Sequence, residues 1–337
     1  MVHRPESPRL QGALRVRIAV TGSIATDHLM TFEGRFAEQL IADQLEQVSL
    51  SFLVEELDVR RGGVAANISF GMGRLGLRPL LVGSAGADFD EYRAWLERHG
   101  VDTACVRISD RRHTARFVCT SDRDQNQIAS FYAGAMTEAR EIDLGALVEE
   151  HGIELALIGA DDPQAMLRHS DACRDRGLPF AADPSQQLAL MDGEDVRRLI
   201  DGAAYLFTNE YEKALAEQKT GWTDEEILDR VGIRVTTLGG KGVRIDRKGE
   251  PPISVDAAEV ATKADPTGVG DAFRAGFLAA TAWGLPLERA AQVGNATAVH
   301  SLEVDGPQEY ELTKAGLLAR ISASYGEQSA AEVEPHL

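Results

Sequence analysis

The sequence holds few cysteines and no long apolar run. Its three cysteines, Cys105, Cys119 and Cys173, are odd in number and widely spaced, which fits neither a disulfide framework nor a metal-ligand pattern. We therefore interpret them as structural thiols of a cytoplasmic protein. No apolar run approaches the ~20 residues that a membrane-spanning helix needs, so we expect no membrane partner.

Basic residues are scarce relative to acidic ones. There are 35 lysines and arginines against 53 aspartates and glutamates, which gives a net charge of −18. A surface this acidic repels phosphate backbones and anionic lipids, so the sequence predicts no nucleic-acid partner. It does not exclude a small anionic ligand, because clustered backbone N–H groups can hold one.

Short apolar runs alternate with helix-like stretches along most of the chain. The runs resemble strands buried on both faces and cover residues 16–22, 78–86, 154–162, 178–185, 204–210 and 233–242. The helical patterns cover residues 64–76, 89–100, 162–177 and 192–202. This alternation predicts an α/β fold with a large, mostly parallel sheet flanked by helices. Ligands bind beyond the carboxyl ends of such strands.

Three segments depart from this rhythm. Residues 45–60 alternate like a half-buried strand, and residues 113–132 indicate two strands around a polar turn. We expect them to form a small, discontinuous β-sheet lid, with lid segments at about 28–61 and 108–135. Residues 1–15 are polar, hold two prolines and lack the apolar segment of a signal peptide, which predicts a disordered N-terminal extension.

The stretch "ADPTGVGDAFRAGFLAA", residues 264–280, carries the strongest chemical signal. Gly268 and Gly270 let the backbone approach an anion closely. The N–H groups of residues 268–271, Val269 included, would form an anion hole at a helix N-terminus. Asp271 beside that hole suits a general base that deprotonates a nucleophile while the hole stabilises a phosphoryl group. The alternative is an aspartate that only caps the helix.

Four motifs in order resemble those of the ribokinase-like carbohydrate and nucleoside kinases. They are "RGGVAAN" (61–67), "TNEYE" (208–212), "VTTLGGKG" (235–242) and "DPTGVGDAF" (265–273). In the last, Pro266 and Val269 replace the usual Thr and Ala, and neither change removes a reactive group. The resemblance covers about residues 16–325 as one kinase domain and leaves residues 326–337 as a C-terminal tail. Within the family, "AVTGSIATDHLM", "HTARF" and "AADPSQQL" are most similar to actinobacterial adenosine kinases.

The resemblance implies an adenosine kinase of purine salvage. Asp271 would take the proton of the adenosine 5′-hydroxyl as that oxygen attacks the γ-phosphate of ATP. Asp27 can accept hydrogen bonds from two ribose hydroxyls, or it only caps a turn. The other expected substrate-binding residues are Ser23, Gly63, Asn67, Phe117, Phe131, Gln186 and Gln187. The two phenylalanines would stack on the base or merely pack the lid, and the two glutamines would bond a purine edge or face solvent.

On the nucleotide side, the family pattern implies that Asn209 and Glu212 organise Mg²⁺ through water. Glu212 has the alternative of being a solvated first-turn residue. ATP would contact Asn209, Thr237, Gly239, Gly242 and Asn295. Members of the family often respond to a monovalent cation such as K⁺ near the anion hole, which this sequence alone does not establish.

An exposed, half-apolar sheet needs a partner, and in this family the lid is often a dimerisation surface. We therefore expect a homodimer through the lid, in which residues such as Phe52 reach the neighbour's site. Three rival functions remain open: a kinase of a free sugar such as ribose or fructose, a nucleoside kinase for guanosine or inosine, and a non-catalytic ligand-binding regulator. The regulator would not need Asp271.

Overall fold

The computed structural model describes residues 16–39 and 51–337, and the expected N-terminal extension lies outside them. Nine strands of the described residues form the main sheet, in the order β13-β12-β11-β10-β9-β8-β1-β4-β5. Their bounds are β1 Ile18–Thr21, β4 Leu80–Gly86, β5 Val106–Ser109, β8 Leu155–Ile158, β9 Phe180–Ala182, β10 Tyr205–Asn209, β11 Ile233–Thr237, β12 Val243–Asp246 and β13 Ile253–Val255. All pairs are parallel except those that involve β12.

The six strands predicted from the sequence form the centre of this sheet and confirm the predicted α/β class. They are continuous in apolar residues because helices cover both of their faces. The sequence reading missed β5, β12 and β13, which lie at the two edges of the sheet. These edge strands are short or mixed with charge, as in "VRID" of β12, and so they lack the apolar signal of the central ones.

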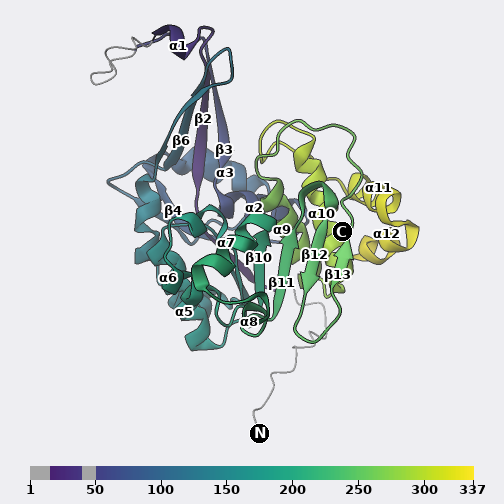
Figure 1. Ribbon diagram of the computed structural model, residues 1–337. Helices are drawn as coiled ribbons and strands as arrows, with labels where there is room; N and C mark the ends of the chain where they lie inside the picture. The colour runs from purple at the N-terminus through teal and green to yellow at the C-terminus, as the bar shows by residue number, and fades with distance from the viewer. Residues whose placement is uncertain (1–15, 40–50) are drawn as a thin grey trace.

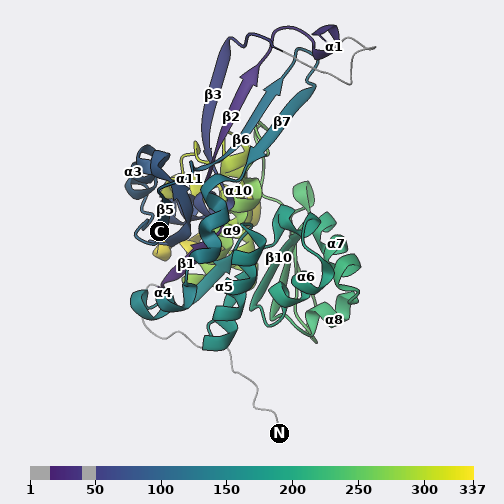
Figure 2. The same cartoon turned by 90° about the vertical axis from the view of Figure 1, so that its left-hand side faces the viewer.

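Helices pack on the two faces of the main sheet and form two separate cores (Figures 1 and 2). One face carries α2 Val64–Arg74, α3 Asp90–Arg98, α9 Val269–Ala282, α10 Leu287–Leu302 and α11 Lys314–Tyr325. The other carries α4 Leu144–His151, α5 Pro163–Arg176, α6 Gly193–Ile200, α7 Glu210–Thr220 and α8 Asp224–Leu228. In α9 the residues from Ala272 to Ala280 are all buried, which explains why this helix is apolar on nearly all sides.

A second, small sheet projects from one end of the molecule (Figures 1 and 2). Its order is β3-β2-β6-β7, with β2 Ala25–Thr31, β3 Glu56–Gly62, β6 Ala115–Ser121 and β7 Gln127–Tyr132. The prediction of two strands within residues 113–132 is confirmed. The predicted strand at 45–60 begins only at Glu56, while residues 40–50 lie outside the described part of the chain.

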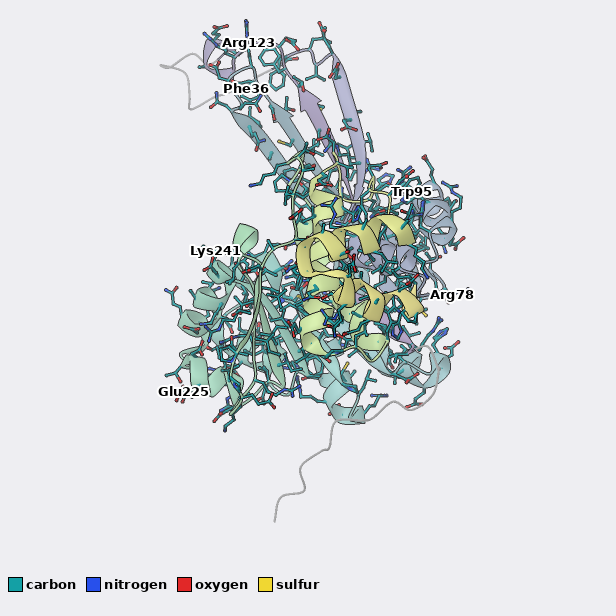
Figure 3. The ribbon with its side chains drawn as sticks, turned by 90° about the vertical axis from the view of Figure 1, so that its right-hand side faces the viewer. Phe36, Arg78, Trp95, Arg123, Glu225 and Lys241 are labelled. Carbon is teal, nitrogen blue, oxygen red and sulfur yellow. The ribbon has the colours of Figure 1, made fainter. Side chains whose placement is uncertain are left out.

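At the tip of the small sheet, where Figure 3 labels Phe36 and Arg123, three aromatic rings form a cluster. Phe36 belongs to the short helix α1 (Phe36–Gln39). The ring centroid of Phe52 lies 4.8 Å from that of Phe32 and 5.3 Å from that of Phe36. The Asp122 carboxylate accepts the backbone N–H of Phe36 and of Asn126, and it thereby ties the β6–β7 turn to this cluster.

The C-terminal segment differs from the expected tail. Residues Glu327–Val333 form helix α12, which packs beside α11. Val333 is completely buried, and Arg289 of α10 donates to Glu332 at 3.0 Å. Because it packs on α10 and α11 through an apolar side chain, this segment is part of the body, by which we mean the main sheet and the helices on its two faces. Within the ranges 16–39 and 51–337, no helix combines the length and apolar character that crossing a bilayer requires.

Candidate active site

The sequence predicts an anion hole from four N–H groups of the glycine loop before α9, and three of them have no backbone acceptor in the described structure. Gly268, the N-cap, has φ +76°, a left-handed conformation that favours glycine. A Cβ there would also lie 2.4 Å from the side chain of Pro307. The N–H of Val269 turns back to Pro266 O at 3.4 Å, so the free donors of the loop's described backbone are the N–H groups of residues 268, 270 and 271.

Asp271 lies at the first turn of α9 beside these donors. Burial raises its pKa from 3.8 to about 7, against the opposing effects of the Arg274 charge and a hydrogen bond from Asn67. The negative charges of Asp183 and Glu212 add to the increase. A carboxylate that titrates near neutrality suits a general base better than a helix cap, because its proton affinity matches the working pH.

Asn67 extends from α2 and donates its amide Nδ2 to Asp271 Oδ2 at 2.8 Å. The turn before α2 contains Gly63 at φ +95°, where a Cβ would lie 2.6 Å from the backbone of Ser23 and Ala25. Ser23 Oγ accepts the N–H of Val64 at 3.0 Å. The structure therefore brings the start of α2 against the end of β1, with Asn67 directed at the start of α9.

Asp27 lies on β2, opposite Arg60 of β3 and Phe117 of β6. Burial raises the pKa of Asp27 to about 6, while the positive charge of Arg60 opposes the increase. Among the described residues its carboxylate has no hydrogen-bond donor. An acceptor that is partly desolvated and unpaired is suited to ligand hydroxyls.

Phe117 and Phe131 are directly paired across β6 and β7. Because opposite residues of neighbouring strands share a face, Arg60, Asp27, Phe117 and Phe131 form one row across the small sheet. Arg60 Nη1 reaches the carboxylate of Asp265 at 2.9 Å. This face of the small sheet therefore lies toward the glycine loop, and Phe131 remains 53% exposed on it.

The two glutamines after β9 do not form an equivalent pair. They belong to the 3-10 turn Ser185–Ala189. Gln187 is 8% exposed, and its Oε1 has no hydrogen-bond donor in the part of the chain that the structure describes. Gln186 is exposed. Of the two, Gln187 is the side chain with unsatisfied, buried hydrogen-bonding capacity.

Asn209 and Glu212 cap α7 reciprocally. Asn209 Oδ1 accepts the N–H of Glu212, and a Glu212 carboxylate oxygen accepts the N–H of Asn209, each at 2.8 Å. Burial raises the pKa of Glu212, and its second oxygen has no partner among the described residues. The two side chains are thus rigid, and Glu212 retains one oxygen that can accept from a metal-bound water.

The remaining nucleotide-side residues lie around the end of β11. Thr237 ends this strand, and Gly239 begins a 3-10 turn that ends at Gly242. A Cβ on Gly242, which has φ +94°, would lie 2.1 Å from Val255 O. Asn295 of α10 is 7% exposed and donates to Asp256 O at 2.9 Å, so its amide holds the loop after β13. In Figure 3, Lys241 marks the end of the main sheet nearer the small sheet, and Glu225 the opposite end.

Two groups of this site were not anticipated from the sequence. Arg274 is 6% exposed, and its Nη2 donates to the buried Asp183 at 2.7 Å. Its Nη1 occupies the space next to Gly270, 2.8 Å from where a Cβ would be. Asp265 accepts from the backbone N–H of Thr267 and Gly306 as well as from Arg60. A charged residue inside an otherwise apolar helix was the available signal for Arg274.

Residues 25–314 match the model of the pfkB family carbohydrate kinases. The chain belongs to this family. It is 34% identical to a Burkholderia thailandensis nucleoside kinase solved in complex with inosine, with a TM-score of 0.81 over 92% of this chain and 99% of that one. A nucleoside kinase of Methanocaldococcus jannaschii is 28% identical over 88% of this chain and 94% of its own. The fold is therefore ribokinase-like, and the protein is a nucleoside or sugar kinase of that family.

The same fold occurs in more distant relatives. A ribokinase from Cryptococcus neoformans in complex with ADP superposes with a TM-score of 0.72 at 22% identity. At that identity the likeness supports the two-sheet architecture alone.

Proposed function

We propose that this protein is an adenosine kinase that transfers the γ-phosphoryl group of ATP to the 5′-hydroxyl of adenosine. The observation that carries the proposal is the row of Asp27, Phe117 and Phe131 on the face of the small sheet toward the glycine loop. A ribose-binding carboxylate beside two aromatic faces matches a nucleoside, whereas a free sugar has no use for the exposed Phe131.

The chemistry follows from the start of α9. Asp271 Oδ2 accepts from Asn67, which leaves Oδ1 to take the proton of the 5′-hydroxyl. The hydroxyl oxygen forms a bond to the γ-phosphorus as the bond from that phosphorus to the bridging oxygen of ADP breaks. The N–H donors of the loop stabilise the charge on the transferred group. The products are AMP and ADP.

Recognition of the nucleoside is divided between the small sheet and the turn after β9. The Asp27 carboxylate accepts from the ribose hydroxyls, and the base stacks against Phe117 and Phe131. We assign recognition of the purine edge to the Gln187 amide, whose oxygen has no hydrogen-bond donor among the described residues. An amide both donates and accepts, so it suits the amino group and ring nitrogens of adenine.

Mg²⁺ bound to ATP would lie near Glu212, whose second carboxylate oxygen is free to accept from a metal-bound water. The described residues contain no cluster of three metal-ligating side chains, and Mg²⁺ that keeps its waters and uses phosphate oxygens needs none. Bound there, the ion neutralises phosphate charge. Asn209 contributes by fixing Glu212 through the reciprocal cap.

A homodimer through the small sheet is part of the proposal. The face opposite Asp27 exposes four large apolar side chains: Leu57, Val59, Ile128 and Tyr132, each at least 46% exposed. Leu57 and Val59 lie on the edge strand β3, and Ile128 and Tyr132 on the opposite edge strand β7. Large apolar side chains exposed at both edges of one face fit a protein interface, and a second copy of the chain offers the same face. Whether Phe52 reaches the neighbour's site remains a prediction.

A phosphotransfer assay with Mg-ATP tests the proposed function. Adenosine, inosine, guanosine, ribose and fructose are offered as acceptors in parallel, with Asp271→Asn as the control enzyme. We expect adenosine to have the highest kcat/KM and to yield the 5′-monophosphate. Turnover of a free sugar with none of adenosine would overturn the assignment of the two phenylalanines, and a preference for inosine or guanosine would overturn the choice of base. Binding of adenosine without any turnover would instead indicate the regulator.

A further inference from the structure

The hydrogen bond from Asn67 to Asp271 depends on which way round the Asn67 amide lies. The amide oxygen and nitrogen have nearly the same shape, so packing alone does not select one orientation. In the productive orientation the NH₂ group donates to the carboxylate. In the reverse orientation a carbonyl oxygen would oppose the carboxylate oxygen. A further group therefore has to hold the Asn67 amide in the productive orientation. If that group is itself an amide, its own orientation also has to be fixed.

Trp95 of α3 supplies a fixed polarity. An indole N–H donates and cannot accept. Trp95 Nε1 lies 3.2 Å from Gln308 Oε1, so the oxygen of the Gln308 amide faces Trp95 and the NH₂ group faces the opposite way. The Trp95 ring itself is held between Phe70, whose ring is stacked at 6.2 Å, and the guanidinium of Arg61 at 4.1 Å.

Gln308 passes this polarity on in two directions. It is 1% exposed, and its Nε2 donates to Asn67 Oδ1 at 2.9 Å and to the Tyr92 hydroxyl. Asn67 Oδ1 is thereby engaged, and only the NH₂ group of Asn67 remains for Asp271. The Tyr92 hydroxyl, having accepted, donates to Gly62 O at 2.8 Å.

The chain of bonds connects parts of the sequence that are far apart. Gln308 is separated from Asn67 by 241 positions and from Tyr92 by 216. In Figure 3, Trp95 lies beside the base of the small sheet, on the flank formed by α3. One branch of hydrogen bonds from Gln308 therefore ends at the proposed general base, Asp271. The other branch ends at Gly62, where the small sheet joins α2.

We propose that Gln308, oriented by the indole of Trp95, is a positioning residue that holds the Asn67 amide with its NH₂ group toward Asp271. The inference rests on the proposed role of Asp271 as general base. With the NH₂ group in place, the ionised form of Asp271 is stabilised and its free oxygen is directed at the acceptor hydroxyl.

Gln308→Glu tests this polarity with almost no change in shape. An ionised carboxylate only accepts, so it draws the Asn67 NH₂ group to itself and turns the Asn67 oxygen toward Asp271. Loss of that donor, together with the negative charge added at position 308, raises the pKa of Asp271 by about one unit. Below pH 7, kcat/KM for adenosine then falls about 10-fold, and it recovers as the pH approaches 9, whereas KM stays within about 3-fold of the wild-type value.

Two controls isolate the effect. Tyr92→Phe breaks only the Gly62 branch. It should therefore leave unchanged the acid limb of the pH profile, the decrease in kcat/KM for adenosine below pH 7. Gln292→Glu makes the same chemical change at another buried glutamine, which accepts from Arg289 on α10, and is also expected to leave the limb unmoved. Trp95→Phe keeps a ring in the stack but removes the donor, and it moves the limb in the same direction as Gln308→Glu.

A measurement without turnover separates this inference from the proposed function. The carboxyl of Asp271 is titrated by ¹³C NMR in the wild-type, Gln308→Glu and Trp95→Phe proteins. A higher pKa of Asp271 in both variants, the second of which adds no charge, supports the inference even if adenosine is not the substrate. An unchanged pKa, or a loss of activity that is equal at every pH, would overturn it. Absence of turnover in the wild-type protein would reject the proposed function alone.

Discussion

Phe180 on β9 and Phe131 on β7 are both strand phenylalanines, yet the first is 1% exposed and the second is 53% exposed. The same contrast holds for the two sheets. The main sheet is covered on both faces by large apolar clusters, whereas the strands of the small sheet contribute only Ala25 and Ala115 to a buried cluster, which Met136 of the 3-10 segment after β7 completes. We infer that apolar residues of the main sheet stabilise the fold, whereas those of the small sheet bind the nucleoside and a second copy of the chain. The predictions below test that division.

Asp271→Asn should have the largest effect on activity. The change removes the base while keeping the shape, and we expect kcat to fall by about 10²–10⁴-fold. The same variant should be more stable. The folded pKa of about 7 exceeds the ordinary 3.8, so the ionised carboxyl destabilises the folded protein increasingly as the pH rises from 4 to 7. Urea titrations at pH 5 and pH 8 should show the larger gain at pH 8. Equal stability at both pH values would contradict the burial of this charge.

Arg274→Met should lower the unfolding free energy strongly. It leaves the carboxylate of Asp183 buried without its ion-pair partner, which costs about 3–5 kcal/mol of unfolding free energy. Denaturant unfolding measures the loss. The double variant Arg274→Met with Asp183→Asn removes both charges and should recover part of the stability. Equal unfolding free energies of the single and double variants would show that the unpaired charge of Asp183 is not the cause of the destabilisation.

Phe180→Ala and Phe131→Ala form a matched pair that sharpens the comparison. The first opens a cavity in the main core and should lower the unfolding free energy by about 3–5 kcal/mol, with little change in the Kd for adenosine of the folded protein. The second should leave stability nearly unchanged and raise that Kd about 5- to 100-fold, as expected from base stacking worth ~1–3 kcal/mol. Similar losses of stability in both variants would refute the division between the sheets.

Val59→Lys places a charge on the face of the small sheet opposite Asp27. It should have the smallest effect on folding, a change of at most ~0.5 kcal/mol in the unfolding free energy. It should nevertheless convert the proposed dimer to a monomer in sedimentation experiments. Leu190→Lys, at a residue that is 77% exposed on the body, is the control and should not alter the assembly. A dimer that survives Val59→Lys would place the interface elsewhere.

The body was more predictable from the sequence than the contacts within the site. The central strands follow from uninterrupted apolar runs, the helices between them from the helical patterns that alternate with those runs, and the start of α9 from the glycines around Asp271. The polar chain from Trp95 through Gln308 to Asn67 could not be predicted, because its members are distant in sequence and only Asn67 belongs to a recognisable motif. Gln186 and Gln187 looked equivalent, and only the turn at Ser185, with φ +45°, separates the buried one from the exposed one.

We infer that the main sheet with its helices transfers the phosphoryl group while the small sheet binds the nucleoside. Calorimetric titration of adenosine into Asp271→Asn and Phe131→Ala tests it most directly. We expect Asp271→Asn, although inactive, to bind adenosine with a Kd within about 3-fold of the wild-type value, whereas Phe131→Ala should bind at least 5-fold more weakly. Wild-type affinity in Phe131→Ala, together with lost binding in Asp271→Asn, would contradict the claim.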